Sequence, residues 1–196
     1  MIAVVDYDTG NLCSVCNALG RIGAQYCVTS NIDTIRSADR VLLPGVGEAS
    51  SAMEKLRERD LCRVIKQLSQ PVLGICIGMQ LMCRSSEEGN AECLGIFDTA
   101  VRRFLPNKEE GVKVPHMGWN SIENLRSPLF KDVSEGAFVY FVHSFAADIN
   151  DDCIAKSANG RQFAAALAKD NFFGTQFHPE KSGDIGDAVL RNFMNL

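Results

Sequence analysis

The chain has 196 residues, of which 46% are hydrophobic and 22% are charged, and its formal net charge is −4 at pH 7. This composition is typical of a globular protein that buries a sizeable core, so we expect a single domain over residues 1–196. The acidic balance argues against a nucleic-acid partner. Because no apolar run approaches the ~20 residues of a membrane span and no N-terminal signal segment is visible, the sequence predicts a cytoplasmic protein without a membrane partner.

Eight cysteines are scattered through apolar segments of a chain too large to need disulfides, so we expect most of them to be reduced core residues. Cys13 and Cys16 have the spacing of a zinc or redox pair. No second pair and no His-x-x-x-His completes a set of four ligands. We therefore predict no metal site and no cofactor.

The first half of the chain alternates between apolar runs and helical patterns. Runs that predict buried strands lie at residues 1–6, 25–28, 41–43 and 72–75. Helical patterns lie between Leu12 and Gly23, over 49–68 with a break near Asp60, and over 79–83. This alternation predicts a doubly wound, largely parallel sheet, in which reactive groups gather at the carboxyl ends of the strands.

The second half is mostly strand-like, at residues 96–104, 139–146, 153–158, 163–168 and 172–177. A short turn is possible at 127–130, and a clear helix returns only at 184–194. Short connections favour antiparallel pairing here. We therefore predict an α/β fold with a mixed, mostly parallel central sheet flanked by helices, and a smaller antiparallel portion in the C-terminal half.

Residues 71–80, PVLGICIGMQ, place Cys76 at a strand-to-helix turn, with Gly74 and Gly78 two residues to either side. This is the Gly-x-Ser-x-Gly elbow with sulfur in place of oxygen. We expect a strained backbone at Cys76 and no room for side chains beside it. The following helix directs N–H groups at the sulfur, which favours the thiolate. Cys76 is thus the candidate nucleophile, and the alternative is a buried cysteine that only packs.

A second candidate group follows a late strand, where His178 and Glu180 are two residues apart. Extended side chains repeat every two residues, so both point to the same side. An imidazole beside a carboxylate supplies the base and the orienting group of a nucleophilic triad. His143, within the strand-like stretch 140–145, and His116, within residues 114–120, are poorer candidates for the base.

An oxyanion hole needs two backbone N–H groups near the nucleophile. The N–H of Ile77 directly follows Cys76, and the loop Pro44–Gly47 follows an earlier strand end. We assign the second donor to this loop, at Val46, and an ordinary tight turn is the alternative.

These motifs together resemble the class I (triad) glutamine amidotransferases over nearly the whole chain. The stretches GICIGMQ (74–80) and QFHPE (176–180) are shared by many members of that family. Four further stretches are similar to the subfamily that forms the glutaminase subunit of imidazole glycerol phosphate synthase: DTGNL (8–12), LPGVG (43–47), PHMGWN (115–120) and YFVHS (140–144).

The resemblance implies that Cys76 attacks the side-chain amide of glutamine, that His178 moves protons, and that Glu180 orients His178. The residues that match glutamine-binding positions of the family are Gly47, Gln80, Glu88, Ser144 and Phe145. Phe145 stands where tyrosine is common, which removes a hydroxyl but leaves the backbone contacts. Without the resemblance, Glu88 would be interpreted as part of a solvated turn.

The resemblance also implies a partner, because nearly every residue is needed to build the glutaminase. The expected partner is a (β/α)₈-barrel synthase subunit in a heterodimer, which uses the ammonia to make imidazole glycerol phosphate and an aminoimidazole carboxamide ribotide in histidine biosynthesis. Asn11, Trp119 and Tyr140 match interface positions. An exposed indole is a plausible anchor for a partner lysine, whereas a half-buried core tryptophan is the alternative.

Three other functions are compatible with parts of the pattern. One is a glutaminase of the same fold that serves vitamin B6, tryptophan or folate, or guanine nucleotide synthesis, against which the Trp119 stretch argues. A thiol hydrolase of the α/β-hydrolase type would place the acid before the histidine, whereas Glu180 follows His178. A regulatory subunit with a relic site would not need all three triad residues.

Overall fold

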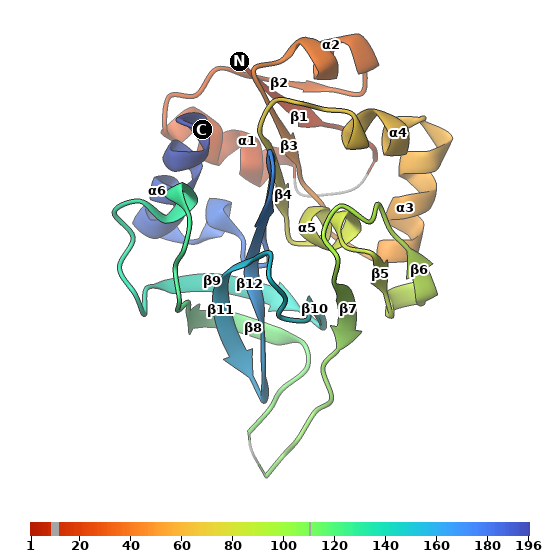
Figure 1. Ribbon diagram of the computed structural model, residues 1–196. Helices are drawn as coiled ribbons and strands as arrows, with labels where there is room; N and C mark the ends of the chain where they lie inside the picture. Colours follow the sequence, from red (N-terminus) through yellow and green to blue (C-terminus); the bar gives the residue numbers. More distant parts are fainter. Residues whose placement is uncertain (9–11, 110) are drawn as a thin grey trace.

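The computed structural model describes residues 1–8, 12–109 and 111–196, and within them a seven-stranded sheet forms the centre (Figure 1). In spatial order its strands are β11 (Cys153–Asn159), β12 (Arg161–Lys169), β13 (Phe172–Thr175), β4 (Val72–Ile75), β3 (Arg40–Leu43), β1 (Ile2–Val5) and β2 (Tyr26–Thr29). Pairings from β13 through β4, β3 and β1 to β2 are parallel, and β11, β12 and β13 pair antiparallel. The predicted mixed, mostly parallel α/β fold is confirmed.

Helices cover both faces of this sheet (Figure 1). One face carries α1 (Leu12–Arg21) and α6 (Gly183–Met194), and the other carries α2 (Ile32–Ser37), α3 (Ala49–Glu58), α4 (Leu61–Lys66) and α5 (Ile77–Met82). Asp60 separates α3 from α4 at φ 57°, which accounts for the predicted break. Helix α2 was not predicted, because its six residues bury only Ile35 and so show no periodicity. None of the described helices is long and apolar enough to cross a membrane.

Two smaller sheets lie beside the carboxyl ends of the central strands. The four-stranded one contains β10 (Phe145–Ala147), β7 (Ala100–Arg103), β5 (Ser85–Ser86) and β6 (Ala91–Glu92), and the two-stranded one contains β8 (His116–Ser121) and β9 (Phe138–His143). Short 3₁₀ helices are η1 (Glu88–Asn90), η2 (Pro128–Phe130) and η3 (Pro179–Lys181). The strand predicted over 139–146 divides at Ser144, so its two parts join different sheets. Strand β8 was not predicted at all.

Central strand β4 is buried at all four positions, and glycines let the neighbouring elements approach it. A Cβ on Gly78 would lie 1.9 Å from the carbonyl oxygen of Leu43, and one on Gly74 would lie 2.6 Å from the carbonyl carbon of Gly78. Since real Cβ atoms do not approach other atoms so closely, α5 packs against β3 and β4 only with glycine at both positions. The predicted lack of room for side chains beside Cys76 is confirmed.

This packing predicts that Gly78→Ala destabilises the protein. The added methyl group overlaps the rigid backbone of β3, and overpacking of this kind typically costs about 1–3 kcal/mol or more. Urea unfolding would measure the free energy of unfolding. Gly20→Ala in α1 is the matched control, because no atom lies within 4 Å of the added Cβ, and alanine there should be neutral or stabilising by up to about 1 kcal/mol. Equal stability of the two variants would contradict the steric argument.

Candidate active site

Three neighbouring parallel strands, β3, β4 and β13, end at the same edge of the central sheet. Ile75 of β4 is in register with Thr175 of β13, and Gly74 with Leu43 of β3. Because the strands are parallel and aligned, the residues that follow them meet at this edge. They are the elbow cysteine after β4, the His-x-Glu stretch after β13 and the glycine-rich loop after β3.

Cys76 has φ 53° and ψ −107°, a backbone conformation that residues other than glycine rarely adopt. Its N–H donates to the carbonyl of Thr175 at 2.7 Å, and its carbonyl accepts from the N–H of Gln80 at 3.1 Å. The first bond ties the turn to β13 and the second starts α5. The predicted strain at the elbow is therefore present, and the side chain is 4% exposed where it lines a pocket.

His178 and Glu180 form a buried pair beside this sulfur. The Nδ1 atom of His178 lies 2.7 Å from Oε1 of Glu180, and the two residues are 1% and 8% exposed. Burial lowers the pKa of His178, but the neighbouring Cys76 sulfur and then the Glu180 carboxylate outweigh it and raise the pKa to about 10. The imidazole is therefore held as a cation at neutral pH, between the sulfur and the carboxylate.

Two buried glutamines form a hydrogen-bonded chain to the Cys76 sulfur that was not predicted. The side-chain Nε2 of Gln176 donates to Cys76 Sγ at 3.6 Å, and its Oε1 accepts from Nε2 of Gln80 at 2.9 Å. Gln80 was predicted only as a glutamine-binding residue. Gln176 had a usable signal, because it lies two residues before His178, and alternation places such side chains on the same side of an extended segment.

The elbow, the histidine and the loop enclose a pocket of about 330 Å³, a volume suited to a small ligand. Nine of the ten residues predicted for catalysis, the oxyanion hole or glutamine binding line it: Val46, Gly47, Cys76, Ile77, Gln80, Glu88, Ser144, Phe145 and His178. Glu180 lies behind His178, to which it is bonded. The structure thus brings the predicted site residues together.

The loop after β3 is anchored against the elbow. The hydroxyl of Tyr7 donates to the carbonyl of Pro44 at 2.7 Å, and a Cβ on Gly45 would lie 2.9 Å from the Ile77 side chain. Gly47 has φ +100°, which favours glycine. This close approach places the backbone of the loop beside the start of α5, where an oxyanion hole needs its two donors.

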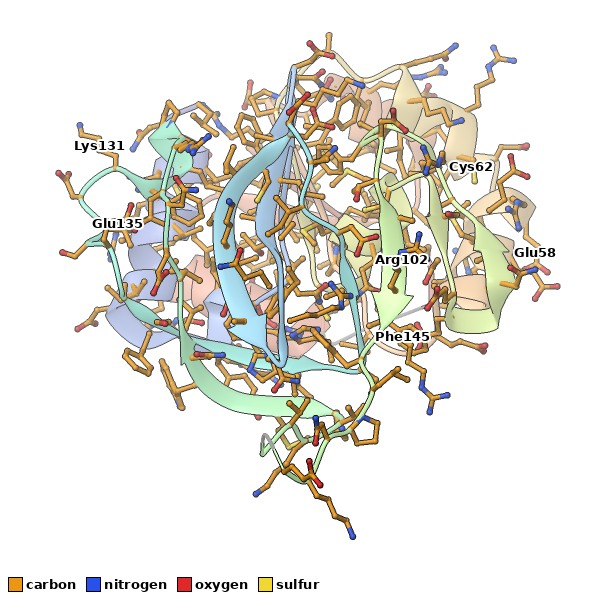
Figure 2. The ribbon with its side chains drawn as sticks, turned by 60° about the horizontal axis from the view of Figure 1, so that its bottom comes forward. Glu58, Cys62, Arg102, Lys131, Glu135 and Phe145 are labelled. Carbon is orange, nitrogen blue, oxygen red and sulfur yellow. The ribbon has the colours of Figure 1, made fainter. Side chains whose placement is uncertain are left out.

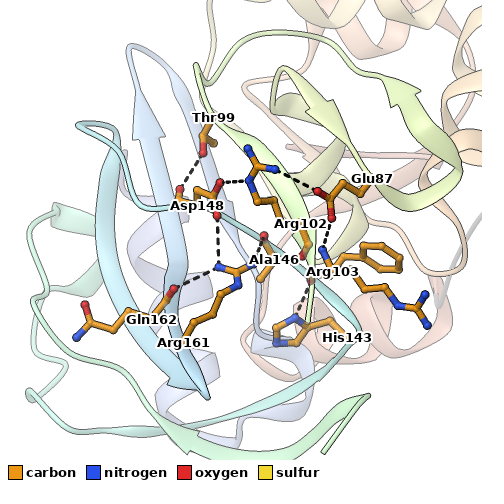
Figure 3. Close-up of polar contacts among 10 residues, drawn as sticks. Glu87, Thr99, Arg102, Arg103, His143, Ala146, Asp148, Arg161 and Gln162 are labelled. Carbon is orange, nitrogen blue, oxygen red and sulfur yellow. Dashed lines mark hydrogen bonds and ion pairs between the residues drawn. The ribbon is translucent and has the colours of Figure 1, made fainter. Parts of the chain in front are cut away.

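Glu88 is half-buried at the pocket wall, and its neighbour Glu87 is held by an ionic network. Oε2 of Glu88 accepts from the N–H of Ala49 at 2.9 Å. Burial raises the pKa of Glu88 above its ordinary value, while this hydrogen bond lowers it in part. Glu87 accepts from the N–H of Arg103 at 2.8 Å and pairs with the Arg102 side chain at 3.1 Å (Figure 3). The network fixes the backbone from which Glu88 reaches the pocket.

Arg102 extends this network to the strand beyond the pocket. The Nε–H of Arg102 donates to Oδ2 of Asp148 at 2.6 Å, and Oδ1 of Asp148 pairs with Arg161 at 3.4 Å (Figure 3). The guanidinium carbon Cζ of Arg161 lies 4.8 Å from the centroid of the Phe104 ring. Arg102 and Phe145 lie on β7 and β10, which pair antiparallel, so the network braces the strand that carries the pocket residue Phe145 (Figure 2).

The other two histidines, His116 and His143, contact each other. His143 also lines the pocket, but its Nδ1 lies 2.8 Å from the Phe145 carbonyl and its Nε2 lies 3.0 Å from Nδ1 of His116. Both rings lie on the inner face of the β8–β9 sheet, which is the face that carries the buried side chains of Val139 and Phe141. Their weaker ranking as candidates for the base agrees with these contacts.

Of the predicted interface residues, the structure describes Trp119, which is exposed, and Tyr140, which is partly buried. Trp119 is 55% exposed and packs edge-on against Tyr140 across β8 and β9, with ring centroids 6.1 Å apart. Trp119 is therefore not a core residue. Asn11 lies outside the described residues.

Several buried polar atoms have no hydrogen-bond partner within the described ranges. They include Nε2 of His178, Oε2 of Glu180 and Oε1 of Gln80. An unpaired buried donor or acceptor typically costs about 1–3 kcal/mol, which a bound ligand or water can recover. Among the described residues, no three His, Cys, Asp or Glu side chains are grouped as metal ligands, and all eight cysteines are free thiols.

Comparison with known families agrees with this geometry. The family described as "Glutamine amidotransferase class-I" matches residues 3–196. The chain belongs to the class-I glutamine amidotransferases, a family of enzymes that release ammonia from glutamine.

Within that family, the chain is similar over its full length to proteins named imidazole glycerol phosphate synthase subunit HisH. The protein of Bacteroides fragilis is 54% identical, with 100% of this chain and 99% of that protein covered. The protein of Pectobacterium atrosepticum is 45% identical over the same shares. Among solved structures, a putative GMP synthase subunit from Thermoplasma acidophilum has a TM-score of 0.76 at 20% identity, covering 99% of this chain and 92% of that one, and this likeness concerns the fold alone.

The raised pKa of His178 predicts a pH-dependent contribution to stability. A histidine whose pKa is higher in the folded state stabilises that state fully below its ordinary pKa of 6.5, and the contribution is lost as the pH rises to about 10. The stability advantage of the wild type over His178→Gln should therefore shrink between pH 6.5 and 10. Urea unfolding at several pH values would measure both proteins.

The same pair of proteins supplies the control for this prediction. Below pH 6 the histidine is protonated in the folded and the unfolded state, so the difference between wild type and variant should be constant there. An advantage that grows with rising pH would mean that His178 is neutral in the folded protein.

Proposed function

We propose that this chain is the glutaminase subunit of an imidazole glycerol phosphate synthase, and that Cys76, His178 and Glu180 hydrolyse glutamine in it. The observation that carries the proposal is the arrangement of a strained, buried cysteine, a histidine–glutamate pair and half-buried Glu88 around one small pocket. Full-length identity of 54% to a protein of that name supports the choice of synthase.

Glutamine fits the chemistry of the pocket wall. The carboxylate of Glu88 suits the α-amino group of the substrate by charge, and the unpaired Oε1 of Gln80 is a buried acceptor for an N–H of the ligand. The backbone at Gly47, Ser144 and Phe145 supplies further polar contacts at the wall. Binding would therefore satisfy an acceptor that is unpaired in the free protein.

The first half of the reaction forms a thioester. The Cys76 thiolate attacks the side-chain carbonyl carbon of glutamine, and the oxygen takes negative charge that the N–H groups of Ile77 and Val46 stabilise. The tetrahedral adduct then breaks its C–N bond, and the imidazolium of His178 gives its proton to the leaving nitrogen. Ammonia leaves, a glutamyl thioester remains, and His178 is neutral.

The second half restores the enzyme. Neutral His178 takes a proton from water, the resulting hydroxide attacks the thioester carbonyl, and the C–S bond breaks to give glutamate and the thiolate. Glu180 holds Nδ1 of His178 throughout, so that Nε2 faces the reacting atoms. The net reaction converts glutamine and water into glutamate and ammonia.

The ammonia needs an acceptor enzyme, and the outer face of the β8–β9 sheet is a suitable surface for one. Met117, Trp119 and Phe138 on this face are 63%, 55% and 59% exposed. Such a group of exposed apolar side chains marks an interaction site. Val142 of β9 lines the pocket and has its carbonyl 4.0 Å from Cys76 Sγ, so the face adjoins the site of ammonia release. We assign it to a barrel-type synthase subunit in a heterodimer.

A glutamate-release assay tests the proposal. We expect the chain to hydrolyse glutamine faster with the synthase subunit and its nucleotide ligand than alone, because the loop at Val46 must complete the oxyanion hole. Cys76→Ala should lower kcat by about 10⁴-fold or more, while the ammonia-dependent reaction of the complex survives. Loss of the ammonia-dependent reaction as well would make Cys76 structural. Unstimulated activity would point to another acceptor enzyme.

The docking assignment makes a separate prediction. Trp119→Ala should weaken binding of the synthase subunit by about 2 kcal/mol or more, roughly 30-fold in Kd, because large aromatic anchors dominate interfaces. Val28→Ala is the control, since Val28 is also exposed but lies on β2 at the far edge of the central sheet. Calorimetric titration would measure both, and equal affinities would place the interface elsewhere.

A further inference from the structure

The inner face of the β8–β9 sheet carries a chain of side-chain hydrogen bonds that leads from Asn120 to the glutamine pocket. Nδ2 of Asn120 lies 3.1 Å from Nε2 of His116, and Nδ1 of His116 lies 3.0 Å from Nε2 of His143. Nδ1 of His143 lies 2.8 Å from the carbonyl oxygen of Phe145. Each of these contacts needs one donor and one acceptor, so the position of every proton matters.

The Asn120 end of the chain has a fixed orientation. Its Oδ1 accepts from the N–H of Ser121 at 2.8 Å, and its Nδ2 donates to the carbonyl of Ala158 at 2.8 Å. A backbone N–H can only donate and a carbonyl can only accept, so the amide cannot be turned over. Asn120 therefore presents a donor to His116, whose Nε2 must be unprotonated.

The Phe145 end of the chain leads independently to the same proton positions. The Phe145 carbonyl can only accept, so Nδ1 of His143 carries the proton and its Nε2 is the acceptor. The contact between the two rings then requires a proton on Nδ1 of His116. Both rings are neutral in this arrangement, because a second proton on either would place a donor against a donor. Burial lowers the pKa of His116 and brings that of His143 to about 3, in agreement with neutral rings.

The chain continues from the Phe145 carbonyl to the nucleophile. That oxygen also accepts from Nε2 of Gln80 at 3.0 Å, whose other proton goes to Oε1 of Gln176. Gln176 then donates to Cys76 Sγ at 3.6 Å. Both partners of Gln80 Nε2 are acceptors, so the orientation of this amide is fixed as well, and its Oε1 remains the free acceptor in the pocket.

We propose that His116 and Asn120 are positioning residues for glutamine hydrolysis, which hold the His143 ring at its Nε2 and thereby hold the Phe145 carbonyl and the Gln80 and Gln176 amides against Cys76. The proposal rests on the proposed glutaminase function. It assigns a role to two residues that touch neither the sulfur nor the pocket. It also accounts for a histidine pair that the reaction itself does not use.

Two substitutions of His116 separate positioning from packing. His116→Asn keeps an N–H donor near the position of Nδ1, whereas His116→Leu keeps the bulk without a donor. The ring of His116 stacks on Phe141 with centroids 4.9 Å apart, so a purely packing role predicts that leucine is the better replacement. A positioning role predicts the reverse order, with kcat of the complex falling about tenfold in the leucine variant and largely restored in the asparagine variant, at little change in KM.

Nitrogen NMR of the histidine rings in the wild-type chain provides a measurement that needs no variant. The proposal requires the Nδ1–H form of both His116 and His143 at neutral pH. An Nε2–H form of either ring, or kcat of the leucine variant equal to or above that of the asparagine variant, would overturn it. A wild-type complex that fails to hydrolyse glutamine would instead refute the proposed function, while the ring protonation states remain measurable.

Discussion

The strained backbone of Cys76 is the constraint on which the rest of the site depends. A residue other than glycine stays at φ 53° and ψ −107° only where the surrounding structure leaves no alternative. Here the N–H of Cys76 is tied to β13, and Gly78 lies against the carbonyl of Leu43 with no space for a methyl group. The same contacts align β3, β4 and β13, so the strain at the nucleophile and the convergence of the three strand ends have one cause.

The site keeps polar groups buried at a cost in stability. Nε2 of His178 and Oε1 of Gln80 lack partners in the described structure, and an apolar pocket of the same shape would avoid that penalty. The neighbouring Glu87 carboxylate is satisfied, because it pairs with Arg102 and accepts from the N–H of Arg103 (Figure 3). Two of the unpaired atoms, on Gln80 and His178, thus belong to residues that line the pocket.

Local sequence patterns were sufficient for the central sheet and the reactive groups, but not for what surrounds them. The elbow follows from two glycines around Cys76, and its proximity to His178 follows from the rule that parallel strands end at one edge. Strand β8 could not be predicted, because Gly118 and Asn120 break its apolar alternation and only pairing with β9 makes it a strand. The contacts of Gln176 are long-range, so its position predicted a side of the strand but no partner.

The β8–β9 sheet can carry both proposed roles because its two faces differ in chemistry. Alternation sends Trp119 and Met117 outward, where they are exposed, and sends His116 and Asn120 inward, toward the pocket. A partner bound at the proposed outer face would contact the same backbone that sets the geometry between Asn120 and His116. Each inner hydrogen bond has a single allowed proton arrangement, so such a shift cannot be absorbed by turning an amide or a ring. A polar chain of this kind would carry a displacement of the sheet to the Phe145 carbonyl, whereas an apolar core at this place would repack.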